Sequence, residues 1–89
     1  MAQPETWFLY IAECRGGNFY VGVAKDVVRR IAEHNKTSKC RYTCYRKPVI
    51  LRYKEVCENY SAARKREAQV KRFSREKKLN IISGKDLYK

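Results

Sequence analysis

The 89-residue chain is short and strongly basic: 21 Lys and Arg residues outnumber 9 Asp and Glu residues, and the formal net charge is +12 at pH 7. We expect a single domain over residues 1–89, because a chain of this length has too little interior for a large multilayer enzyme. With 44% hydrophobic residues, the chain is too apolar to be a wholly disordered tail. Its charge predicts a polyanionic partner. Nucleic acid is the leading candidate, and an anionic membrane surface is the weaker alternative.

The sequence carries no signal for a membrane or for export. No segment has the run of about 18 or more apolar residues that crosses a bilayer, and the N-terminal residues lack the charged and apolar regions of a signal peptide. We therefore expect a cytoplasmic protein whose cysteines are reduced thiols. The four cysteines lack the paired CxxC spacing of zinc knuckles, which argues against a zinc site: Cys14, Cys40, Cys44 and Cys57.

The first predicted element is a β-hairpin. Residues 7–14 and 19–24 are rich in aromatic and branched side chains, and the intervening RGGN sequence is typical of a turn. A three-residue loop over 16–18, with a glycine at positive φ, gives an even pairing sum and places Tyr10 and Tyr20 on the same face of the sheet. The alternative is that both are ordinary sheet tyrosines.

A helix is predicted over residues 26–35, with Asp26 as its N-cap. Four residues form its apolar face at helical spacing: Val27, Val28, Ile31 and Ala32.

Two polar residues of this helix, Arg30 and His34, fall at the edge of the apolar face, while Arg29 points to solvent. A half-sheltered guanidinium binds phosphate strongly, because it offers a rigid fork of donors and keeps its charge. The alternative is that Arg30 pairs with Asp26 as an ordinary surface charge and that His34 merely flanks the apolar face.

The second half of the chain predicts one strand and two helices. Residues 36–48 form a polar, basic connection closed by Pro48, which we expect to order against phosphate. Three elements follow: a strand over 49–57, a helix from a cap at Asn59 or Ser61 to about Ser74, and a helix over 74–82 capped by Ser74. Residues 83–89 are expected to be a loose tail, which leaves a core of about 6–82.

The resulting order is β-β-α-β-α-α. It predicts an α+β fold in which a small three-stranded antiparallel sheet is flanked by helices.

Glu67 is predicted to point inward from the second helix. It falls in the middle of a stripe at helical spacing that consists of Tyr60, Ala63, Val70 and Ser74. Carboxylates are rarely buried alone, so Glu67 must pair with a cation, hydrogen-bond to a tyrosine or coordinate a metal. An ion pair with Arg30 and a metal ligand remain open alternatives.

Taken in order, these motifs resemble the GIY-YIG nuclease superfamily. The first half of the resemblance lies in FLY at 8–10, YVG at 20–22 and AKDVVRRIAEHN at 24–35. RYTCYRKPVILRY and SAARKREAQVKRFSREKKL, with its REAxxKR pattern, resemble the small stand-alone bacterial branch of UPF0213-type proteins. The resemblance covers about residues 6–82. It implies metal-dependent hydrolysis of phosphodiester bonds in nucleic acid, with DNA expected before RNA.

The resemblance also implies a role for five residues. Tyr10 and Tyr20 match the two motif tyrosines; a tyrosine hydroxyl activates water in this family, and we favour Tyr20. Arg30 matches the essential helix arginine and His34 the histidine one turn later. Glu67 matches the glutamate that holds a single Mg²⁺ or Mn²⁺ ion, and attack on phosphorus builds charge that an arginine and a hard cation stabilise.

The sequence departs from the family pattern after the second tyrosine. Several members have a lysine soon after YxG, where this chain has Val23, and Lys25 is the candidate substitute.

Eight basic residues are expected to contact the nucleic-acid backbone: Lys25, Arg29, Lys39, Arg41, Arg46, Lys47, Arg66 and Lys71. Basic runs on a helix are also commonly a solvated face. The alternative function is a basic nucleic-acid-binding module whose catalytic residues are vestigial. The two functions differ in whether the protein cuts DNA in the presence of magnesium.

Overall fold

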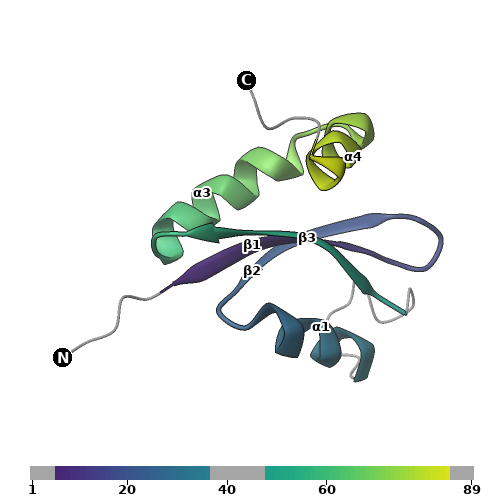
Figure 1. Ribbon diagram of the computed structural model, residues 1–89, viewed down its shortest axis with the longest axis horizontal. Coiled ribbons are helices and arrows are strands. Elements are labelled where there is room, and N and C mark those ends of the chain that lie inside the picture. The colour runs from purple at the N-terminus through teal and green to yellow at the C-terminus, as the bar shows by residue number, and fades with distance from the viewer. Residues whose placement is uncertain (1–5, 37–47, 85–89) are drawn as a thin grey trace.

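The computed structural model describes residues 6–36 and 48–84. Within these residues three antiparallel strands form one sheet, in the order β2-β1-β3: β1 (Trp7–Glu13), β2 (Phe19–Ala24) and β3 (Ile50–Cys57). Helices cover both faces of the sheet (Figure 1). One face carries α1 (Val27–Lys36), and the other carries α3 (Tyr60–Lys71) and α4 (Arg75–Ser83). The predicted α+β fold and its β-β-α-β-α-α order are confirmed.

The central strand β1 is buried on both faces. Its successive side chains point to opposite sides of the sheet. Tyr10 and Ala12 therefore join the apolar layer beneath α1, while Leu9 and Ile11 join Val70 of α3 in the layer on the other face. Residues 9 to 12 are at most 1% exposed, which explains why the strand sequence is apolar without interruption.

The hairpin register has the predicted parity. Tyr10 lies opposite Gly22, and Ala12 lies opposite Tyr20. Because these pairs share an even sum, Tyr10 and Tyr20 project from the same face of the sheet. The loop itself is displaced by one residue from the prediction: the Cys14 N–H donates to the Asn18 carbonyl at 2.7 Å, so the loop is 15–17 instead of 16–18.

Helix α1 buries a different face from the one predicted. Val28 is 70% exposed, and Ala32 is also exposed, so the predicted apolar face is wrong at these two positions. Val27 and Ile31 do pack against the layer beneath α1, and His34 is buried at 2% exposure. The helix is rotated toward a polar residue because His34 has a hydrogen-bonding partner on the sheet, and a buried imidazole needs one.

Capping residues set the other helix boundaries. Asn59 caps α3, its side chain accepting a backbone N–H at 2.8 Å, so the cap is not Ser61. The helix ends at Lys71, before the predicted end at Ser74, because Ser74 is the N-cap of α4. Helix α4 ends at Ser83 and is capped by Gly84, whose φ of 82° is left-handed. Across 6–36 and 48–84, no helix combines the length and apolar character needed to cross a membrane.

The four cysteines divide between described and undescribed parts of the chain. Cys14 is buried in the layer beneath α1, and Cys57 packs against the layer on the α3 face. Neither of these two described cysteines forms a disulfide. Cys40 and Cys44 lie outside the described residues, as do most of the predicted basic connection and the end of the predicted tail.

Candidate active site

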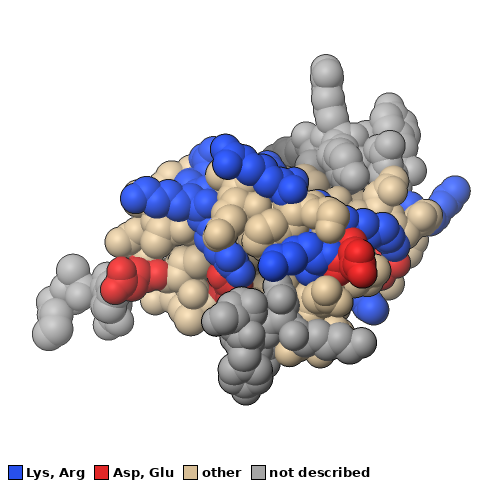
Figure 2. All heavy atoms as spheres, turned by 90° about the horizontal axis from the view of Figure 1, so that it is seen from above, with Lys and Arg blue, Asp and Glu red and all other residues tan. Residues whose placement is uncertain are grey.

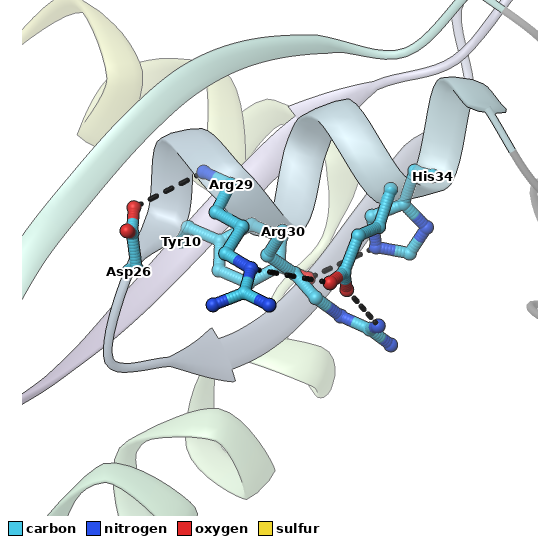
Figure 3. A network of polar contacts seen from close by, with 6 residues as sticks. Tyr10, Asp26, Arg29, Arg30 and His34 are labelled. Carbon is cyan, nitrogen blue, oxygen red and sulfur yellow. Dashed lines mark hydrogen bonds and ion pairs between the residues drawn. The ribbon is translucent and has the colours of Figure 1, made fainter.

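Four of the predicted site residues come together between the sheet and α1. The Tyr10 hydroxyl lies 3.1 Å from Nε2 of His34 (Figure 3). The Tyr20 ring packs edge-on against His34, with 5.0 Å between ring centroids, and lies 6.2 Å from the Tyr10 ring. Arg30 lies one turn before His34 on α1 and hydrogen-bonds to Tyr10. We refer to Tyr10, Tyr20, Arg30 and His34 as the tyrosine–arginine cluster.

The two neighbouring arginines of α1 differ as predicted, since the Arg29 side chain is 77% exposed and that of Arg30 is 41% exposed. Arg30 donates to Glu33 at 3.2 Å (Figure 3). Burial alone would lower the pKa of Arg30, but its hydrogen bonds to Glu33 and Tyr10 outweigh that effect and the pKa is raised. Asp26, the alternative partner, instead caps α1 by accepting the backbone N–H of Arg29 at 3.1 Å. Arg30 is thus a permanent cation beside a phenol.

His34 is neutral at physiological pH. Burial, followed by the positive charge of Arg30, lowers its pKa from the ordinary value of 6.5. In one tautomer of the neutral ring, Nε2 accepts a hydrogen bond from the Tyr10 hydroxyl. The Tyr10 hydroxyl then has the imidazole as its acceptor and interacts electrostatically with the Arg30 guanidinium.

Gly22 allows the two phenol rings to share this face. It lies opposite Tyr10, and a Cβ added to it would be 2.7 Å from the Tyr10 hydroxyl oxygen and 3.1 Å from Cε2 of Tyr20. The first of these distances is too short for any real side chain, so the Tyr10 ring passes over Gly22 only because that residue has no side chain. One signal of this contact was visible in the sequence, namely the glycine two positions after Tyr20.

Glu67 makes its contacts on α3, which covers the opposite face of the sheet (Figure 1). Its side chain is 14% exposed, so the predicted inward orientation is confirmed. The carboxylate lies 2.9 Å from Nε of Arg64 and 3.1 Å from Nζ of Lys71. No ion pair joins the described residues Glu67 and Arg30, and that alternative is wrong. The cations that pair with Glu67 come from its own helix.

Comparison with known proteins identifies the family. A family model described as the GIY-YIG catalytic domain matches residues 6–80. The chain belongs to the GIY-YIG family. A UPF0213 protein of Staphylococcus saprophyticus is 46% identical over 76 residues, which cover 85% of this chain and 93% of the relative. Another, from Desulfotalea psychrophila, is 40% identical over 89 residues, which cover 94% and 81%.

A solved structure agrees with this assignment. The solution NMR structure of a UPF0213 protein from Bacillus halodurans aligns with a TM-score of 0.56 at 35% identity. The alignment covers 88% of this chain and 83% of the other. In this GIY-YIG domain, the two motif tyrosines and the motif glycine are the residues that pack against one another on the α1 face of the sheet.

Glu67 is the residue of this GIY-YIG domain that could hold a divalent ion. A carboxylate suits Mg²⁺, which takes oxygen ligands and usually keeps several of its waters. The described residues contain no group of three His, Cys, Asp or Glu side chains able to hold a metal ion, so water or substrate would complete the shell. Arg64 and Lys71 hold the carboxylate now, but their side chains are 58% and 55% exposed and are long enough to turn into solvent.

The eight predicted phosphate contacts fall into three groups. Three are exposed: Lys25, Arg29 and Lys71. Four lie outside the described residues: Lys39, Arg41, Arg46 and Lys47. Arg66 instead connects α3 to β3, with its Nε donating to Glu55 at 2.7 Å and its NH1 to Gln69 at 2.7 Å. Its guanidinium is therefore better suited to joining the helix to the sheet than to contacting a phosphate.

The ionisation of His34 provides a direct test of the cluster. His34 is the only histidine in the chain, so its ring protons can be followed by NMR without assignment. We expect a pKa below 6.5, and a higher value in Arg30→Ala because a neighbouring positive charge is removed. Because the folded-state pKa is lowered, His34 binds a proton more readily in the unfolded chain than in the folded one. The contribution of His34 to the free energy of unfolding is therefore complete above pH 6.5 and falls as the pH decreases toward the folded-state pKa. A folded-state pKa of 6.5 or more would contradict the burial of the ring.

The contact at Gly22 predicts a specific overpacking effect. We expect Gly22→Ala to displace the Tyr10 ring and to lower the free energy of unfolding by about 1–3 kcal/mol, the usual cost of overpacking. Urea unfolding measures the stability, and the His34 NMR signal reports whether the contact with Tyr10 survives. Val23→Ala, on the other face of the same strand, should leave the His34 signal unchanged. An unchanged signal in Gly22→Ala would show that the rings do not depend on this glycine.

Proposed function

We propose that this GIY-YIG domain is a metal-dependent endonuclease that hydrolyses phosphodiester bonds of nucleic acid, with DNA as the expected substrate and the cytoplasm as its location. The observation that carries the proposal is the half-buried Arg30 on the same face as the Tyr10–His34 contact and the Tyr20 ring. The match to a GIY-YIG catalytic domain over residues 6–80 supports it. A net charge of +12 suits a polyanionic substrate.

In the proposed reaction Tyr20 removes a proton from the attacking water. Tyr10 is 1% exposed, whereas Tyr20 is only partly buried, so Tyr20 is the phenol that water can reach. A free tyrosine has a pKa of about 10, and a phenol serves as a base near neutral pH only where positive charge stabilises its phenolate. Arg30 supplies that charge, since the two side chains interact electrostatically.

Arg30 has a second role at the phosphorus. The transition state places negative charge on the phosphate oxygens, and a fixed guanidinium at the edge of the cluster stabilises it. Tyr10 and His34 hold Arg30 in place through the chain of contacts from imidazole to phenol to guanidinium. Glu67, on the α3 side of the sheet, would hold the divalent ion, which would supply Lewis-acid stabilisation of phosphate charge when bound.

The proposal is tested by incubating the purified protein with single strands, flaps and duplexes in Mg²⁺, in Mn²⁺ and in EDTA. We expect cleavage only with a divalent ion. We also expect Glu67→Ala to lose cleavage but keep salt-sensitive binding. Glu76→Ala, which removes an exposed carboxylate from the first turn of α4, is the matched control and should cut normally.

The alternative function, a nucleic-acid-binding module, is favoured by one observation: both oxygens of Glu67 are engaged by cations. Binding without cleavage of any of these substrates, with either ion, would establish this alternative.

A further inference from the structure

An aromatic pair lies on the surface where β1 and α3 begin. The rings of Trp7 and Tyr60 are 4.7 Å apart between centroids and are tilted by 57°. Tyr60 is 45% exposed, and Trp7 is only partly buried. The pair is therefore open to solvent, unlike the buried ring of Tyr10 beneath α1.

Two cations lie against these rings. Nζ of Lys25 is 5.5 Å from the centroid of Trp7, and the guanidinium carbon of Arg64 is 5.7 Å from that of Tyr60. Arg64 also donates to the Tyr60 hydroxyl at 2.8 Å. The four side chains come from β1, from the junction of β2 with α1, and from α3. We refer to Trp7, Tyr60, Lys25 and Arg64 as the aromatic–cation patch.

We propose that the aromatic–cation patch binds an unpaired base of a nucleic acid strand, a proposal that rests on the proposed function. An exposed aromatic ring offers a stacking surface that every base can use, and adjacent cations neutralise the flanking phosphates. Bases inside a duplex are stacked on their neighbours, so a side-chain platform of this kind engages single strands, flaps and frayed ends. Trp7 and Tyr60 are the stacking surface, and Lys25 and Arg64 are the phosphate contacts.

Lys25 and Arg64 can exchange their contacts with the rings for contacts with phosphates at little cost in free energy. Cation–π contacts at exposed sites are weak because water competes for the charge, so a base can replace Lys25 or Arg64 against a ring while the cation turns to a phosphate. Other basic side chains extend the same surface. Figure 2 shows Lys and Arg spread over the face that α3 and α4 cover, and Lys65, Lys71 and Arg72 are exposed along it.

The patch lies on the same side of the sheet as Glu67, whereas the tyrosine–arginine cluster lies on the other side. Trp7 precedes Tyr10 by three positions on β1, a separation of roughly 10 Å along the strand, and its side chain points to the opposite face. Lys25 precedes Asp26, the cap of the helix that carries Arg30. Arg64 reaches Glu67 at 2.9 Å. A base held on the patch therefore keeps its neighbouring phosphates near Glu67.

The fluorescence of Trp7 tests the proposal directly, because Trp7 is the only tryptophan in the chain. The full chain is titrated in EDTA, which prevents metal-dependent cleavage, with a short single-stranded DNA and with a blunt duplex of the same length at the same salt concentration. We expect the single strand to change the emission of Trp7 and to bind about tenfold more tightly than the duplex, as expected for one stacked base. An unchanged emission at saturation, or an equal change with the duplex, would overturn the proposal.

Two variants of Tyr60 distinguish the contribution of its ring to binding from that of its hydroxyl. Tyr60→Leu removes the stacking surface, while Tyr60→Phe keeps it and loses only the hydrogen bond with Arg64. We expect Tyr60→Leu to weaken single-strand binding by about tenfold and Tyr60→Phe by less than about threefold, as measured by anisotropy of a labelled oligonucleotide. Lys65→Ala is the control for loss of one exposed charge on α3. Equal affinities of the two Tyr60 variants would refute the platform.

The outcome is independent of the nuclease assay. A response of Trp7 without any cleavage would support the patch and count against the proposed nuclease, while cleavage without this response would do the reverse. Because Tyr60 lies exposed in the first turn of α3, its variants should fold even where a Trp7 variant does not, and thermal unfolding checks this.

Discussion

Arg30→Ala is expected to lower the single-turnover rate of DNA cleavage by about 10²- to 10³-fold, the usual effect of removing a preorganised donor to transition-state charge. Substrate binding should change by less than about threefold, because one phosphate contact among many contributes little to affinity at moderate salt. The physical reason is the environment of Arg30. Its side chain is 41% exposed, donates to Glu33 and interacts electrostatically with Tyr10 and Tyr20.

The neighbouring Arg29 provides a matched control for this variant. Its side chain is 77% exposed and pairs with the same Glu33 at 3.6 Å, so Arg29→Ala removes an equal charge from the same helix without touching a phenol. We expect it to affect only salt-sensitive binding. Arg30→Lys should recover part of the rate, since a lysine restores the charge but not the fork of donors. Equal losses of rate in the two alanine variants would show that Arg30 is an ordinary phosphate contact.

The elements and their caps were predictable because they depend on local chemistry. Period-two alternation and an even pairing sum place Tyr10 and Tyr20 on one face regardless of which three residues form the loop, so the error of one residue in the loop did not matter. Ser74 caps α4 for a reason visible in the sequence, since its hydroxyl accepts the backbone N–H of Lys77 at 3.1 Å.

The orientation of α1 was not predictable in the same way. Its sequence contains an apolar arc that includes Val28, yet Val28 is 70% exposed and His34 is buried. An amphipathic pattern ranks side chains by hydrophobicity alone and cannot include a hydrogen bond to a tyrosine two elements earlier in the chain. That bond, from Tyr10 to His34 at 3.1 Å, offsets the cost of burying a polar ring.

The ion pairs of Glu67 were partly predictable from the sequence. Arg64 and Lys71 stand three and four positions from it, the spacings at which helix side chains meet, so an ion pair within the helix was available from the sequence and was overlooked in favour of Arg30. The contact between Trp7 and Tyr60 could not be predicted from the sequence, because it joins the start of β1 to the start of α3 and depends on how the helix lies on the sheet. Local patterns name the residues of this site, but long-range packing decides which of them meet.

The second large effect is expected for Tyr20→Phe, which should reduce the cleavage rate by about 10²- to 10⁴-fold, the range for loss of a general base. The ring packing against His34 at 5.0 Å remains possible without the hydroxyl, so the fold should persist. Single-turnover rates of the wild type and the variant at one pH measure this effect.

Two other tyrosines make this prediction specific. Tyr53→Phe removes a hydroxyl that donates to Glu55 at 2.6 Å, where burial and this bond raise the Tyr53 pKa to about 12. Tyr53 packs on the face opposite the tyrosine–arginine cluster, and its hydroxyl bonds to Glu55 and not to Glu67, so cleavage should not change. Tyr10→Phe should cost less than Tyr20→Phe, because Tyr10 is buried and acts through Arg30 and His34. A larger loss in Tyr10→Phe would mean that the buried phenol is the base, and water would then have to reach it by displacing the contact with His34.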